Sequence, residues 1–184
     1  MIVGVVNRLR AILLFTALLA AGADIRAQNT NRPAESPLTW QLHQALNFAQ
    51  HGDRQEAMDL VLRLLEQHPD FAPAIKLKGM LLEEAGRTAE AAAAYEEALK
   101  LAPNDGDLLL KTGIYKLTAG KKEEALRLLQ RCIRILPGDG DAQYYLAQAY
   151  HLNGQDELAL RAIRQSLKAE PDNVSCLLYT SRCV

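Results

Sequence analysis

The stretch "APAIKLKGMLLEEAGRTAEAAAAYEEALKLAPND" (residues 72–105) decides the fold of this chain. Its first half has the apolar spacing and composition of a helix and stops at Gly86, a residue type that readily adopts the positive φ found just past a helix end. Acids and alanines then open a second helix, with Glu90 in the first turn, where the helix dipole favours an acid. Pro103 ends that helix because it has no backbone N–H. The stretch therefore predicts two helices joined by a short turn.

The same landmarks recur every 34 residues on both sides of this stretch. A proline, a glycine, an alanine and a small residue each form a column with four members. The columns are Pro69, Pro103, Pro137 and Pro171; Gly52, Gly86, Gly120 and Gly154; Ala57, Ala91, Ala125 and Ala159; and Ala45, Gly79, Gly113 and Ala147. Four columns in one register indicate an internal repeat rather than a bias in composition.

This repeat predicts an all-α fold, an α-solenoid of four stacked helix–turn–helix units. The small residue in the first helix and the alanine in the second let the two backbones approach closely. One unit cannot bury its apolar face alone, so stacking against its neighbours must cover that face. The predicted repeats are residues 38–71, 72–105, 106–139 and 140–173.

On these residues the chain resembles the tetratricopeptide repeat family, over residues 38–173. The family's large residue in the middle of the second helix appears as Val61, Tyr95, Leu129 and Ile163. Its large residue late in the first helix appears as Phe48, Leu82 and Tyr150, but Lys116 breaks that column. Before the small residue, where the family favours Leu, the chain has Gln44, Lys78, Thr112 and Leu146. Cys132 shares a column with Leu64, Ala98 and Ser166, which indicates a packed small residue rather than a reactive thiol.

The resemblance implies a concave groove along the first helices, which in the family holds an extended peptide or a helix. The matching positions are Leu42, Leu46, Lys76, Met80, Leu110, Ile114, Leu117, Tyr144, Gln148 and Leu152. This set is unusually apolar, which predicts a partner segment that is apolar or amphipathic. Alternatively, several of these side chains pack between helices, because each lies one or two residues from a core column.

The N-terminal residues 1–27 predict a secretory signal peptide. Arg8 and Arg10 precede the apolar run "AILLFTALLAA" (residues 11–21), which is shorter than the roughly 20 residues of a membrane anchor, the alternative interpretation. We expect cleavage after Ala27, or else after Ala23, with residues 28–37 as a polar linker. The predicted location is periplasmic or secreted, with no stable membrane insertion after cleavage.

The charge balance gives no reason to expect a nucleic acid partner. The whole chain has a net charge of −1, and removal of residues 1–27 leaves 18 basic and 21 acidic residues, a net charge of −3. We expect no metal and no cofactor, because the four histidines show no ligand spacing and the glycines form no phosphate-binding loop. We therefore expect no enzymatic activity. One subgroup of the family grips the acidic C-terminus of a partner with Lys and Asn side chains across three adjacent repeats. We do not expect this function here, since only Lys76 matches those positions and Asp141 would repel a carboxylate.

The tail departs from the repeat. Val174 and Ser175 read as the start of a truncated fifth repeat, and residues 176–184 resemble the translated mosaic end of a transposon used as a sequencing adaptor. The alternative is a short natural capping helix. If the tail is an artefact, Cys176 and Cys183 say nothing about disulfides or metals. An uncapped fourth repeat also predicts self-association through its exposed face.

These patterns predict a non-enzymatic scaffold of the cell envelope that binds a protein or peptide partner in an apolar groove. The alternative is the N-terminal repeat portion of a larger protein for exopolysaccharide or cellulose secretion, or for outer-membrane assembly. Arrays resembling this one precede outer-membrane barrels in such systems.

Overall fold

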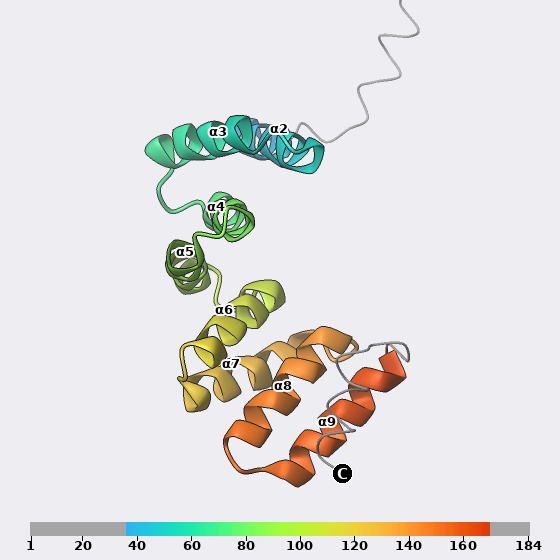
Figure 1. Ribbon diagram of the computed structural model, residues 1–184. Helices are drawn as coiled ribbons and strands as arrows, with labels where there is room; N and C mark the ends of the chain where they lie inside the picture. The colour runs from blue at the N-terminus through green and yellow to red at the C-terminus, as the bar shows by residue number, and fades with distance from the viewer. Residues whose placement is uncertain (1–35, 170–184) are drawn as a thin grey trace, which may run out of the picture. The chain divides into compact units, whose positions relative to one another are not determined.

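The computed structural model describes residues 36–169, which form eight helices and no strand (Figure 1). The helices are α2 (Pro37–His51), α3 (Arg54–Gln67), α4 (Ala72–Glu84), α5 (Thr88–Leu101), α6 (Gly106–Thr118), α7 (Lys122–Ile135), α8 (Gly140–Leu152) and α9 (Asp156–Ala169). Within each predicted repeat a first helix is followed by a second. The all-α repeat fold expected from the sequence is therefore confirmed. The predicted signal peptide, most of the linker and the whole tail lie outside the described residues.

The turn inside each repeat depends on its glycine. Gly52, Gly86, Gly120 and Gly154 have φ between +72° and +88°, a backbone region that disfavours residues with a side chain. Each of these glycines follows a first helix by one or two residues, so the predicted helix stops are confirmed. The prolines at positions 69, 103 and 137 each lie two residues past the end of a second helix, which also agrees with their predicted role.

Two first helices begin with the same cap, one repeat apart. The Asp105 carboxylate accepts a hydrogen bond from the Leu108 N–H at 3.0 Å, and the Asp139 carboxylate accepts one from the Ala142 N–H at 2.7 Å. These bonds satisfy backbone donors that the first turn of a helix leaves without a partner. A similar bond lies at the start of α2, where the Ser36 hydroxyl accepts a hydrogen bond from the Thr39 N–H at 3.2 Å.

The core of each repeat pairs the small residue of the first helix with the large residue of the second. A Cβ placed on Gly79 would come within 2.8 Å of the Tyr95 ring, and one on Gly113 within 2.8 Å of Leu129. The large residues Val61, Tyr95, Leu129 and Ile163 are all fully buried. The predicted core columns are therefore confirmed.

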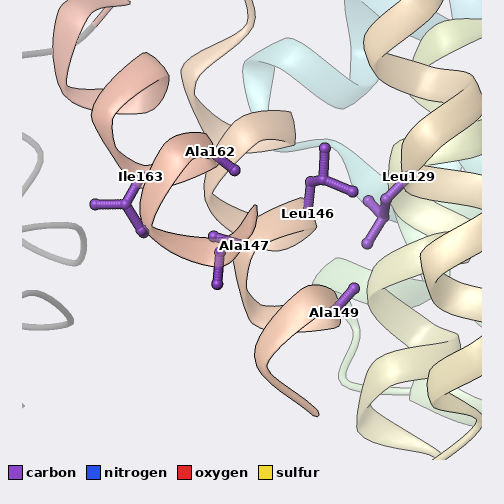
Figure 2. Close-up of a cluster of buried hydrophobic side chains, with 7 residues drawn as sticks. Leu129, Leu146, Ala147, Ala149, Ala162 and Ile163 are labelled. Carbon is purple, nitrogen blue, oxygen red and sulfur yellow. The ribbon is translucent and has the colours of Figure 1, made fainter. Parts of the chain in front are cut away.

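Packing between repeats is clearest around Leu129. Figure 2 shows this α7 side chain pointing toward Leu146 of α8, beside Ala162 of α9. Helices of successive repeats, such as α5 and α6 or α7 and α8, also contact one another. One buried cluster thus spans the third and fourth repeats, as a solenoid requires.

Lys116 breaks the apolar column of the first helices, as the sequence predicts, and the structure shows what compensates for it. Its side chain is only 13% exposed, and its ammonium lies 2.7 Å from a Glu96 oxygen and 3.3 Å from a Glu124 oxygen. The hydrogen bond to Glu96 raises the pKa of Lys116. Thr112, a further polar departure, is buried, and its hydroxyl has no hydrogen-bond partner.

Cys132 packs as a small buried residue, which confirms the prediction. Its Sγ donates a hydrogen bond to the Gly106 carbonyl at 3.3 Å. The next member of its column, Ser166, donates to the Gly140 carbonyl at 2.8 Å. Burial, with the charges of Asp139 and Asp107, raises the pKa of the Cys132 thiol to about 11. Because a reactive cysteine needs a thiolate, this side chain is structural.

Candidate functional site

Two adjoining hollows lie along the first helices. The first, of about 290 Å³, is lined by residues of α2 and α4, by Ala102 at the end of α5 and by residues at the start of α6. The second, of about 460 Å³, is lined by residues of α4, α5 and α6. Lys76 and Met80 of α4 belong to both, so the hollows form one groove. We call it the first-helix groove; its lining residues are Leu42, Leu46, Ala72, Pro73, Lys76, Leu77, Met80, Glu83, Glu84, Tyr95, Ala102, Asp105, Asp107, Leu108, Leu110 and Lys111.

Five of the ten residues predicted for a groove line this one. Leu42 and Leu46 come from α2, Lys76 and Met80 from α4, and Leu110 from α6. Met80 is the most open of the apolar side chains at the centre, with 40% of its surface exposed. A flexible thioether side chain adapts to differently shaped apolar partners.

The other five predicted residues lie outside the two hollows. Ile114 and Gln148 are half-buried and share the register of Met80. Leu117 and Tyr144 pack partly against the buried cluster around Leu129 and Leu146, so the alternative of packing between helices holds for them in part. Leu152 is largely exposed at the end of α8.

Lys76 is the one basic residue among the predicted groove positions, and it is already paired. Its ammonium donates to both Asp105 oxygens at 3.1 and 3.0 Å and to an Asp107 oxygen at 2.8 Å. Burial alone lowers the pKa of Lys76, but the hydrogen bonds to Asp107 and Asp105 raise it above its usual value. Burial likewise raises the pKa of Asp105, but the Leu108 N–H and Lys76 lower it overall. Both groups are therefore charged at neutral pH.

Glu83 is the centre of a second polar cluster in the groove. Its two oxygens accept from the Lys111 ammonium, each at 3.0 Å, and one accepts from the Tyr95 hydroxyl at 2.7 Å. Burial, together with the hydrogen bond to Glu83, raises the pKa of Tyr95 above its usual range. The tyrosine thus joins the buried core to the groove surface through its hydroxyl.

The acids of the groove are what sequence reasoning missed. The apolar positions follow from matching the chain to the family's groove, whereas Lys76 bonds to carboxylates 29 and 31 residues ahead, at the start of the next first helix. One signal was available, because Asp105 and Asp139, and likewise Asp107 and Asp141, keep the repeat spacing. The groove is consequently less apolar than the sequence predicts.

A third hollow, of about 380 Å³, lies among α5, α6 and α7 and contains none of the predicted groove residues. Four of its charged side chains, Glu96, Lys116, Glu124 and Arg131, are bonded within the chain. Lys116 is held by Glu96 and Glu124, and Arg131 donates to the Pro103 carbonyl at 2.7 Å.

The described part of the chain contains neither a metal-binding cluster nor a helix that could span a membrane. Between residues 36 and 169, no group of three or more His, Cys, Asp or Glu side chains is placed to hold a metal ion. All four histidines are exposed; His51 bonds to the Asn47 carbonyl and His151 to Asp156. Over the same residues, every helix is too short or too polar to span a lipid bilayer.

Two family models, each described as a tetratricopeptide repeat, match residues 42–106 and 116–176. Among solved structures, MamA (residues 41 to the end) from Desulfovibrio magneticus RS-1 is similar, with a TM-score of 0.66 and 19% identity over 78% of this chain and 81% of that one. A structure reported for pilF of Pseudomonas aeruginosa has a TM-score of 0.64 and 19% identity over 79% of this chain and 69% of that one. At this identity the likeness concerns the fold alone. No curated protein sequence matches.

Proposed function

Because this chain is a tetratricopeptide repeat protein, we propose that it is a non-enzymatic scaffold that binds a segment of a partner protein in the first-helix groove. The observation that carries this proposal is the continuity of the groove: two hollows share Lys76 and Met80 and extend over the first three repeats. Repeat arrays commonly use such an extended surface for binding.

The chemistry of the groove supports a peptide or helix as the bound element. Leu42, Leu46, Met80 and Leu110 supply apolar contacts from three successive first helices. Apolar surface that is contiguous and rimmed by polar groups is typical of a protein interaction site. A helix or an extended segment can place side chains at several points along such a groove.

Substitution of Met80 tests this function. Met80→Asp places a charge at the apolar residue that both hollows share, and we expect capture of the specific partner to fall by at least about tenfold, because several apolar contacts then lie against a carboxylate. The measurement is quantitative mass spectrometry of proteins retained by the immobilised chain and its variants.

Leu62→Asp is the matched control. Leu62 lies on the second helix α3, outside the groove, and is 41% exposed against 40% for Met80. Its replacement should leave the partner bound. If Met80→Asp and Leu62→Asp retain the same proteins in the same amounts, the groove is not the binding site.

We also propose that the protein works in the cell envelope, in the periplasm or outside the cell. The support is the basic and then apolar sequence of residues 1–27, which has the pattern of a cleavable signal. Cell fractionation with N-terminal sequencing tests this, and a chain that keeps Met1 and stays with the cytoplasmic fraction would refute it.

A further inference from the structure

We propose that the segment bound in the first-helix groove is basic as well as apolar, and that one of its Lys or Arg side chains pairs with Asp107. The inference rests on the proposed function and specifies the chemistry of the partner. It comes from the way in which the charges inside the groove are already paired.

Neither lysine of the groove is available to an acidic ligand. Lys76 donates to three carboxylate oxygens of Asp105 and Asp107 at 2.8 to 3.1 Å. Lys111 donates to both oxygens of Glu83 at 3.0 Å. A partner carboxylate would have to displace one of these internal carboxylates and would leave that acid without its cation, which is costly in a partly buried site.

The pairing also leaves one negative charge in excess. Lys111 balances Glu83, and Arg54 of α3 balances Glu84, with its Nε 2.7 Å from a Glu84 oxygen. Lys76, however, carries a single positive charge against two carboxylates. The excess charge is therefore located at the Asp105–Asp107 pair.

Of these two acids, Asp107 is the one that a partner can reach. Its side chain is 66% exposed, against 30% for Asp105. Asp105 is also occupied as the cap of α6 through the Leu108 N–H. Asp107 lies beside Leu110 and Met80 in the wall of the second hollow, so a basic side chain reaching it comes from a segment whose apolar side chains fill that hollow.

The next repeat extends the same chemistry. Asp141 holds the register of Asp107 in the fourth repeat, and the neighbouring Tyr144 and Tyr145 rings meet edge to face with centroids 5.2 Å apart. Burial, with the charges of Asp141 and Glu83 contributing, raises the pKa of Tyr145. The face of an aromatic ring attracts a cation rather than a carboxylate.

Three synthetic peptides test the inference. All have the same length and the same leucines, and their polar positions are arginine in one peptide, glutamine in the second and glutamate in the third. Binding to the purified protein is measured by fluorescence anisotropy at low and at physiological ionic strength. We expect the arginine peptide to bind about fivefold more tightly than the glutamine peptide, the glutamate peptide to bind most weakly, and added salt to reduce the difference.

Two substitutions that each remove one negative charge show whether the preference for the arginine peptide arises at Asp107. Asp107→Asn should reduce the affinity for the arginine peptide to that for the glutamine peptide, and it should leave the affinity for the glutamine peptide unchanged. The helix itself should be retained, because Asp105 still caps α6. Glu97→Gln, on the exposed face of α5 outside the groove, should change the binding of neither peptide. Circular dichroism of both variants checks that the helices are retained.

The outcomes separate this inference from the proposed function. If the arginine and glutamine peptides bind equally, or if Asp107→Asn has no effect, the inference is wrong while groove binding stands. Tightest binding by the glutamate peptide would overturn it as well. If no peptide binds, or if all bind equally well to Met80→Asp, both the inference and the proposed function fail.

Discussion

Gly79 and Gly113 have no Cβ at the two positions where Tyr95 and Leu129 lie against the first helix of their own repeat. Residues larger than glycine do not fit at Gly79 without a shift of the neighbouring atoms, because an added methyl group would lie 2.8 Å from the fully buried Tyr95 ring. The ring is also held in place by the hydrogen bond from its hydroxyl to Glu83 at 2.7 Å. Tyr95 therefore has little room to move away from a larger neighbour.

Gly79→Ala tests the tightness of this contact. Alanine is the better helix former by about 1 kcal/mol, but overpacking a rigid core contact costs about 1–3 kcal/mol. We expect overpacking to dominate and the free energy of unfolding to fall by about 1 kcal/mol in urea denaturation.

Gly138→Ala is the control for this substitution, because a Cβ there has no atom within 4 Å. It should leave the free energy of unfolding unchanged or raise it slightly. Equal effects of the two substitutions would mean that the Gly79–Tyr95 contact is not tight.

At the scale of the helix, Asp105 and Asp139 show how one residue type sets where α6 and α8 begin. Asp105 has a second role, since it also accepts hydrogen bonds from the Lys76 ammonium. The start of α6 is thus tied to the middle of α4 in the preceding repeat.

Replacing Asp105 separates the two roles. Asp105→Ala should lower the free energy of unfolding by at least about 1 kcal/mol through loss of the cap, while Asp105→Asn keeps a capping oxygen and loses only the charge. The folded-state pKa of Asp105 lies below its usual value of 3.8, so its charged form stabilises the fold fully above that pH. This contribution is lost as the pH falls through the lower folded-state pKa.

Urea denaturation at neutral pH and at a series of pH values below 3.8 measures this effect. The difference between the unsubstituted chain and Asp105→Asn should disappear in acid. Asp139→Asn, at the equivalent cap of α8, serves as the comparison. A difference for Asp105→Asn that persists at the lowest pH would contradict the role of its charge.

At the scale of the whole molecule, the free energy of unfolding should divide among the repeats and the contacts between them, because each repeat contacts the repeats next to it in the chain. Leu129 joins two units: it fills the space beside Gly113 of α6 and packs in one cluster with Leu146 of α8 and Ile163 of α9.

Leu129→Ala tests this division. The substitution should cost about 2–5 kcal/mol and loosen the fourth repeat more than the second. Hydrogen exchange of α8 and α9 should accelerate strongly, while exchange of α4 and α5 changes little. A uniform acceleration over α4 to α9 would instead indicate a single cooperative unit.

The fold follows from the sequence because the repeat makes every landmark visible four times. The helix stops at the glycines and the column of small residues were predicted from the register, and the large residues of the second helices from the resemblance to the tetratricopeptide repeat family. The groove was predicted only in part, since Leu42, Leu46, Lys76, Met80 and Leu110 line it, whereas the acids around Lys76 were missed. Their positions depend on how one repeat is rotated against the next, which no spacing within a helix encodes. The predicted signal, tail and self-association stay predictions.

The bond from Cys132 to the Gly106 carbonyl and its counterpart from Ser166 to Gly140 each join a second helix to the first residue of the helix before it. Donor and acceptor belong to the same repeat in both cases. An in-frame duplication or deletion of the codons for residues 106–139 would therefore add or remove both partners of this bond together, so neither Cys132 nor Ser166 would lose its acceptor. Unequal recombination between such codons could change the number of repeats while each remaining unit kept its internal bond. Evolution can therefore lengthen or shorten the chain by one whole repeat at a time.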